Sequence, residues 1–194
     1  MISRFGFIPI HSQLVKNEET FNKIAGRYIT SLEQIGGERW TKEDVKSPKP
    51  FFYLMLTGGT EELLLNLRKE RSKHIQNEPV ILLAIPTHNS LPASLEVLAR
   101  LQQDNEKGQI IYLTESNGKI GVNQIEEILR DLEVWFALKR MRIGMVGTPS
   151  DWLIASKPEP KTLQETWGST VVPISMEEIR ENLQAVNPQS IKII

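Results

Sequence analysis

The stretch that decides the predicted fold is ILLAIPTHNSLPASLEVLARL, residues 81–101. It begins as an apolar run, which is typical of a buried strand, and passes through a polar turn, PTHNS. Leucines then recur at the spacing of one helix face, at Leu91, Leu95, Leu98 and Leu101. We expect Ser90 to be the N-cap of this helix. The stretch therefore predicts a strand, a turn and a helix, in that order.

The same alternation runs through most of the chain. Apolar runs predict strands over residues 4–10, 51–56, 80–85, 109–114 and 142–147, and more weakly over 169–174. Amphipathic segments that predict helices lie between them. Strands that are apolar on both faces and are each followed by a helix indicate a parallel sheet covered on both sides. The predicted fold class is α/β: a flavodoxin-like, doubly wound parallel sheet of about five strands with helices on both faces.

The domain boundaries follow from this pattern. We expect residues 1–186 to form a single Rossmann-like α/β domain. The polar segment 40–50 is expected to be a linker within it. Residues 187–194 end in IKII, which resembles the start of a strand, so we expect a truncated linker or next domain there.

Composition narrows the function. The chain has 194 residues and a net charge of −1, with acidic and basic residues well mixed, so neither nucleic acid nor a membrane surface is expected as a partner. Cysteine is absent, which excludes disulfides and thiolate chemistry. No signal peptide and no membrane-spanning run is evident, so we expect a cytoplasmic protein.

Candidate ligand-binding residues follow the predicted strands. Ligands of such sheets bind beyond the carboxyl ends of the strands. Hydroxyl, amide, imidazole and carboxylate groups at that edge could bind a polyol. The candidates are His11, Gln13, Thr57, Gly58, Gly59, His88, Asn89, Ser90 and Asp151.

Each candidate also has a purely structural interpretation. Caps and tight turns accumulate Ser, Asn and Gly in any strand-to-helix bend. Gly58 and Gly59 could form only a turn, or could let an anion approach a helix N-terminus. No metal-binding motif, nucleophile elbow or general acid–base pair is recognisable, so no catalytic residue and no metal ligand is predicted.

Four motifs resemble one known family. GFIPIH, TGGTEE, HNSLPASLEVLARL and RIGMVGTPSDWLIAS, spread over residues 6–156, are similar to the N-terminal domain of the L-fucose isomerase and L-arabinose isomerase superfamily. The resemblance implies cytoplasmic aldose–ketose isomerases that use Mn²⁺ or a similar divalent ion. Their metal ligands and catalytic acids lie in later domains, beyond the part that this sequence matches. It also implies a homo-oligomer in which the loops at 11–13 and 88–90 approach a neighbouring active site.

Three functions remain open at this point. The first is an N-terminal domain of a sugar isomerase-like protein, which supplies assembly surface and peripheral contacts to a sugar site but no catalytic metal centre. The second is a stand-alone module that binds a sugar or sugar phosphate without catalysis. The third is a structural interaction domain in which tryptophans contribute to a subunit interface: Trp40, Trp135, Trp152 and Trp167.

Overall fold

The structure is a computed structural model, and it describes residues 4–116, 118–156 and 159–186. The chain divides into two compact units, Met1–Glu133 and Val134–Ile194, which are described separately. The predicted start of a further domain at residues 187–194 lies outside the described residues.

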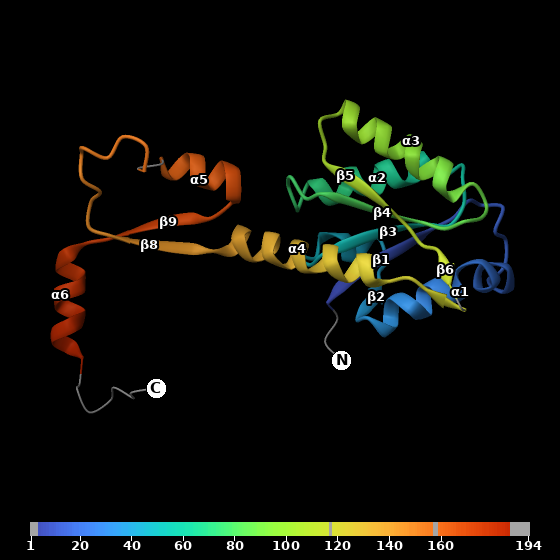
Figure 1. Cartoon of the computed structure of the whole chain (residues 1–194), viewed down its shortest axis with the longest axis horizontal. Coiled ribbons are helices and arrows are strands. Elements are labelled where there is room, and N and C mark those ends of the chain that lie inside the picture. The colour runs from blue at the N-terminus through green and yellow to red at the C-terminus, as the bar shows by residue number, and fades with distance from the viewer. Residues whose placement is uncertain (1–3, 117, 157–158, 187–194) are drawn as a thin grey trace. The chain divides into compact units, whose positions relative to one another are not determined.

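The first unit contains a parallel five-stranded sheet with the strand order β2-β1-β3-β4-β5 (Figure 1). In chain order its elements are β1 (Phe5–Ile10), α1 (Glu18–Gln34), β2 (Gly37–Arg39), η1 (Glu43–Lys46), β3 (Phe51–Met55), α2 (Glu61–Ser72), β4 (Val80–Ala84), α3 (Ser90–Gln103), β5 (Gly108–Tyr112), β6 (Glu115–Ser116), β7 (Lys119–Ile120) and the beginning of α4 (Asn123–Arg140). The short strands β6 and β7 form a separate antiparallel hairpin.

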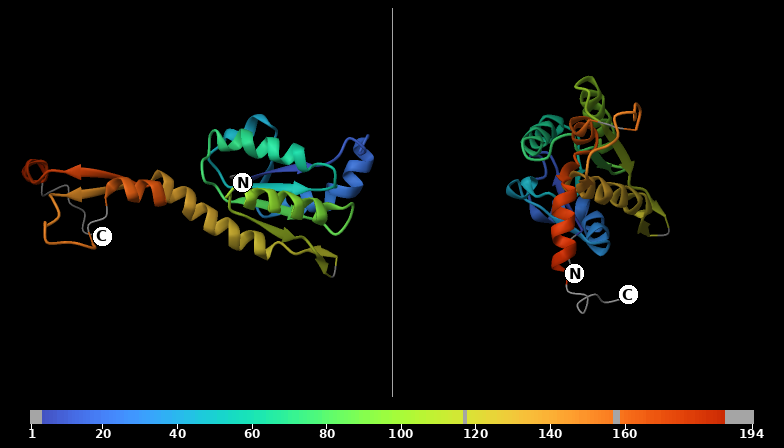
Figure 2. Two further views of the ribbon diagram at one scale, coloured as in Figure 1. Left: turned by 90° about the horizontal axis from the view of Figure 1, so that it is seen from above. Right: turned by 90° about the vertical axis from the view of Figure 1, so that its left-hand side faces the viewer.

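Two hydrophobic cores cover the two faces of this sheet. One core packs Phe21 and Tyr28 of α1 and Ile125 of α4 against the sheet. The other packs Leu64 of α2 and Val97 of α3 against the opposite face. Figures 1 and 2 show α2 and α3 together on one side of the sheet and α1 on the other. The predicted doubly wound, flavodoxin-like α/β fold is therefore confirmed.

The prediction assigned one strand to the wrong sheet. Residues 142–147 were expected in the main sheet, but the structure gives that sheet a different fifth strand, β2. Helix α1 is followed by Gly36, which has a φ of 91°, and the chain then re-enters the sheet at once as the sequence GER. A three-residue polar edge strand carries no apolar pattern, so it could not be recognised from the sequence.

The segment 40–50 is anchored to the first unit, and is more than the linker that was predicted. Trp40 and Val45 are buried in the core, and Trp40 stacks on Phe51 with ring centroids 5.2 Å apart. A Cβ atom on Gly6 would lie 2.0 Å from the Trp40 ring, so only glycine fits beneath the indole.

A buried ion pair holds the same segment from the other side. The Arg71 guanidinium pairs with both carboxylate oxygens of Glu78, and both side chains are buried. The guanidinium also donates to the backbone carbonyls of Val45, at 2.6 Å, and of Lys49, at 2.8 Å. Burial raises the pKa of the Glu78 carboxyl above its ordinary value, although the Arg71 hydrogen bonds act in the opposite direction.

The second unit contains a parallel two-stranded sheet of β8 (Arg142–Val146) and β9 (Thr170–Ile174). Helix α5 (Pro160–Trp167) precedes β9 and helix α6 (Met176–Ala185) follows it. Ser175 is the N-cap of α6, and its Oγ accepts a hydrogen bond of 3.0 Å from the Glu178 amide. Among the described residues, no helix has the length and apolarity needed to cross a bilayer.

Candidate functional site

A cleft of about 700 Å³ opens at the carboxyl ends of β1, β3 and β4. The order of the sheet explains its position. Strand β1 is followed in sequence by β2 on one side, and the chain then crosses to β3 on the other side. Loops that leave neighbouring strands in opposite directions separate at such a switch point and leave a crevice for a ligand. The loops β1–α1, β3–α2 and β4–α3 supply most of its lining.

Thr57 connects two of these loops. Its hydroxyl oxygen accepts a hydrogen bond of 2.8 Å from the Ser12 amide in the β1–α1 loop. Its carbonyl accepts a hydrogen bond of 2.8 Å from the Thr60 hydroxyl, which closes the turn before α2. Thr57 is largely buried yet lines the cleft, so its side chain fixes the spacing of the two loops at the base of the site.

The two glycines after Thr57 have different roles. Gly58 lies close to the β4–α3 loop: its amide donates to the His88 carbonyl at 2.8 Å, and a Cβ atom there would lie 3.0 Å from Asn89 Cβ. Gly59 has a φ of 72°, which favours glycine. Its amide donates to Glu61 Oε1 at 3.3 Å. The Glu61 carboxylate, on the first residue of α2, therefore already accepts a hydrogen bond from an amide that an anionic ligand would otherwise use.

His88 and Asn89 form the opposite wall. Both have a φ of 58°, in the left-handed region that asparagine tolerates better than most residues. Both side chains are exposed at the cleft. His88 Nδ1 lies 2.8 Å from Thr87 Oγ1, and no hydrogen bond joins the Asn89 carboxamide to another described residue. Two consecutive residues in this conformation are a local backbone strain, which is often found at ligand-binding turns.

Ser90 is not the N-cap that the sequence suggested. That position belongs to Asn89, and Ser90 is the first residue of α3. The Ser90 side chain is fully buried, and it does not line the cleft. Its hydroxyl accepts from the Ile85 amide at 2.9 Å and donates to the Met55 carbonyl at 2.6 Å. Ser90 therefore joins the carboxyl ends of β3 and β4 and supports the cleft from beneath.

Three other candidates do not line the cleft. His11 Nδ1 lies 3.2 Å from the Ser12 carbonyl, to which it can only donate, and its ring packs edge-on against Phe21 with the ring centroids 5.1 Å apart. Gln13 is exposed on the β1–α1 loop. Asp151 follows β8 in the second unit, so it does not belong to the switch-point edge of the five-stranded sheet.

Sequence reasoning missed part of the lining. Two carboxylates lie at the cleft: Glu61 on the first turn of α2 and Glu96 on the second turn of α3. Val15, Ile24 and Ala93 add an apolar surface that is continuous with the two cores.

The arrangement could bind a small polar molecule. Thr57, Gly58, Gly59, His88 and Asn89 are brought together at one cleft, as the sequence suggested for the strand ends. None of the described histidines and acids gather in a group of three that could hold a metal ion. Hydroxyl, amide and carboxylate groups can bind the polar groups of a small molecule, while the adjacent apolar surface packs against its carbon–hydrogen faces.

Comparison with known proteins adds no assignment to this site. No family model matches the sequence, and no curated protein is similar enough to it to count as a relative.

Proposed function

We propose that residues 4–133 act as the N-terminal domain of a cytoplasmic, homo-oligomeric sugar isomerase-like protein. In this proposal the cleft at the carboxyl ends of β1, β3 and β4, which we name the switch-point cleft, contributes peripheral contacts to a sugar site. Other domains supply the catalytic centre. The observation that carries the proposal is the cleft itself, in which polar groups from three loops surround an apolar surface at the ligand-binding edge of the sheet. Three of the four motifs that resemble sugar isomerases lie within these residues, and that resemblance supports the choice of ligand.

The lining suits a polyol. A sugar offers hydroxyl groups, which both donate and accept hydrogen bonds, and patches of carbon–hydrogen surface. Thr57 and Asn89 provide groups of both kinds, and the Glu96 carboxylate provides acceptors. Val15 and Ile24 offer the apolar surface on which a sugar ring could lie. The exposed Asn89 carboxamide has no partner among the described residues, which leaves it available for a ligand.

Charge favours a free sugar over a sugar phosphate. The cleft is lined by two carboxylates, Glu61 and Glu96, and by no lysine or arginine among the described residues. Glu61 also takes up the Gly59 amide at the start of α2. A phosphate group would meet like charge in the place where a helix N-terminus usually attracts it. Of the alternatives raised by the sequence, a phosphate-binding module is therefore the less favoured.

The divalent metal of the resembling family is proposed only for domains beyond those described. The described residues of this cleft do not form a ligand set for such an ion: its two carboxylates are single groups on different helices. In an assay of aldoses with added Mn²⁺, we expect the 194-residue chain to show no isomerase turnover. Turnover above background would contradict the division of labour that is proposed.

Titration with free aldoses tests binding directly. Amide resonances of the labelled chain would be followed during addition of L-arabinose and L-fucose. We expect saturable shifts in the loops around Thr57 and Asn89. Substitution Asn89→Gly keeps a backbone that tolerates positive φ and removes only the carboxamide, so it should weaken binding about fivefold, the equivalent of one hydrogen bond.

A matched control is available in the same unit. Asn77 has a φ of 59°, is exposed and lies outside the cleft, so Asn77→Gly makes the same chemical change away from the site. It should leave sugar affinity unchanged. If both variants bind the sugar as the wild type does, or if no resonance in the cleft shifts saturably, the proposed sugar contact is wrong.

A further inference from the structure

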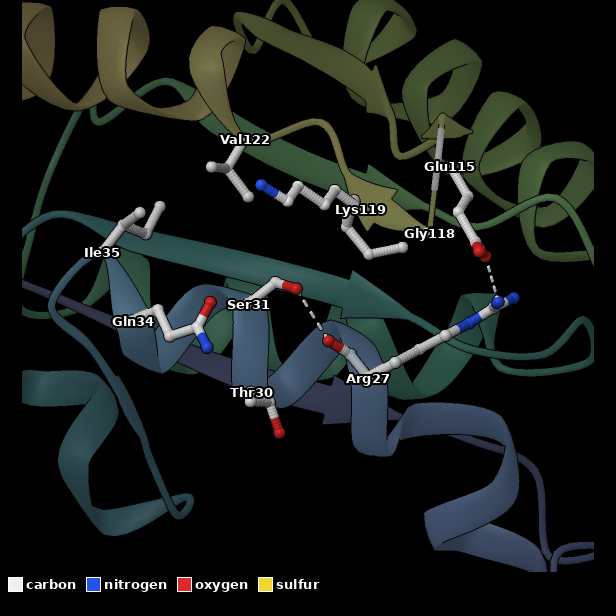
Figure 3. A pocket seen from close by; sticks show the side chains of 10 residues that line it. Arg27, Thr30, Ser31, Gln34, Ile35, Glu115, Gly118, Lys119 and Val122 are labelled. Atoms are coloured by element: carbon white, nitrogen blue, oxygen red, sulfur yellow. Dashed lines mark hydrogen bonds and ion pairs between the residues drawn. The ribbon is translucent and has the colours of Figure 1, made fainter.

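A second cleft, of about 580 Å³, lies on the α1 face of the first unit. It runs between the carboxyl-terminal half of α1 and the β6–β7 hairpin with the start of α4 (Figure 3). It shares no lining residue with the switch-point cleft, and its charge is of the opposite sign. Two cationic side chains, Arg27 and Lys119, line it, against a single carboxylate, Glu115.

The charges divide the cleft into two ends. At one end Arg27 forms an ion pair with Glu115, which Figure 3 marks by a dashed line. Arg27 also donates to the Tyr28 hydroxyl at 3.1 Å, so its guanidinium is occupied. Figure 3 shows Lys119 extending away from this pair toward Val122. The two ends therefore differ: one is neutralised, and the other carries a cation.

Lys119 is not used by the rest of the fold. Its ammonium makes no ion pair and no hydrogen bond with the residues that the structure describes, including the carbonyls at the end of α1. It therefore does not act as a cap for that helix. The exposed Lys119 side chain lines a concave surface together with Ile35, Ile120 and Val122.

The other lining residues suit a ligand whose anionic group is bound by the Lys119 ammonium. Ile35, Ile120 and Val122 pack against the core below and present apolar surface to the cleft. Gln34 adds a carboxamide on the α1 side, and this group makes no hydrogen bond with another described residue. A molecule with one anionic group and a short apolar body would place its charge at Lys119, its other acceptors at Gln34 and its body on the isoleucines.

We propose that this cleft, which we name the α1–hairpin cleft, binds a small organic anion through Lys119 and Gln34. The anionic group is a carboxylate or a phosphate, since both accept charge-assisted hydrogen bonds from an ammonium. This site is independent of the switch-point cleft. A failed test of anion binding here would leave the proposed sugar site standing, and the reverse is also true. Binding here would tie α1 to the β6–β7 hairpin.

The test uses three probe molecules, which distinguish the contributions of the ligand's charge, its anionic group and its apolar body. The labelled chain is titrated with inorganic phosphate, with n-butyrate and with butan-1-ol, the uncharged counterpart of butyrate. We expect saturable shifts of the amides of Gln34, Ile120 and Val122 with at least one anion at millimolar concentration, and none with the alcohol. Butyrate without phosphate would identify a carboxylate site, and the reverse a phosphate site.

Two lysine variants complete the test. Lys119→Met keeps the aliphatic stem and removes the charge, so it should weaken anion binding about tenfold, the equivalent of one charge-assisted hydrogen bond. Lys23→Met makes the same change on the exposed face of α1, outside the cleft, and should change nothing. The proposal is overturned if no anion shifts these amides up to about 10 mM, if the alcohol shifts them equally, or if both variants behave alike.

Discussion

Substitution of Ser90 distinguishes the two roles that sequence and structure give this residue. The structure makes its hydroxyl a buried bridge between Ile85 and Met55, with hydrogen bonds of 2.9 and 2.6 Å. In Ser90→Ala the Ile85 amide loses its side-chain acceptor in a buried place, and the Met55 carbonyl loses a donor. An unsatisfied buried amide costs about 1–3 kcal/mol and a lost hydrogen bond about 1 kcal/mol, so the free energy of unfolding should fall by about 3 kcal/mol.

Ser94→Ala is the matched control. Ser94 is also fully buried, one turn later in the same helix, and its hydroxyl donates to the Ser90 carbonyl at 2.8 Å. That carbonyl already accepts a bond within the helix, and alanine is the better helix former, so the change should cost no more than about 0.5 kcal/mol. Urea unfolding followed by amide resonances of β3 and β4 would measure the first unit alone.

Ser90→Asp makes the test decisive. Aspartate is among the best N-caps, so a capping role predicts that this variant is as stable as the wild type within about 0.5 kcal/mol. A bridging role predicts a loss greater than about 3 kcal/mol, because a buried carboxylate cannot donate to the Met55 carbonyl and loses its own solvation. An aspartate variant of wild-type stability, or equal losses in Ser90→Ala and Ser94→Ala, would refute the bridge.

Further predictions address the core, the buried ion pair and the sugar cleft. Gly6→Ala should destabilise the first unit by about 3 kcal/mol because its new methyl group meets the Trp40 ring, whereas Gly26→Ala, on an open helical position of α1, should stabilise it by about 0.5–1 kcal/mol; thermal unfolding measures both. Glu78→Ala should cost about 3 kcal/mol, since it removes both hydrogen-bond acceptors of the buried Arg71 guanidinium. Because the folded-state pKa of Glu78 is raised, the folded state holds this proton more tightly than the unfolded state. The stability of the wild type relative to the alanine variant should therefore fall as pH rises from about 4 through the raised pKa, which urea titrations at several pH values would measure. Glu61→Gln should raise the affinity for a sugar phosphate relative to the free sugar about threefold, by removal of one like charge, and calorimetry with arabinose 5-phosphate and arabinose would measure that ratio.

Strong periodic signals in the sequence predicted most of the first unit. The stretch 81–101 did form a strand, a turn and a helix, and both faces of the sheet are covered as its apolar strands required. The edge strand β2 could not be seen, because its residues GER face no core and its three positions are too few for a period. Residues 142–147 have the pattern of a buried strand, but pattern alone does not say which sheet a strand joins.

The candidate site was predictable at the level of loops and less so at the level of atoms. The carboxyl-end rule selected the turns that hold Thr57, Gly58 and Asn89, and these do line one cleft. The role of Ser90 depends on a contact with Met55, 35 residues earlier, which no local motif encodes. Glu96 was missed because a glutamate on a helix is usually a solvent-facing residue, and only the fold brings it to the cleft.

A crystal structure of the chain soaked with L-arabinose tests the central claim most directly. We expect one sugar in the switch-point cleft, hydrogen-bonded to Asn89 and with a carbon–hydrogen face on Val15 and Ile24. The same soak with Asn89→Gly crystals should show weaker occupancy. A cleft that stays empty at saturating sugar, or a sugar bound elsewhere in the first unit, would contradict the account.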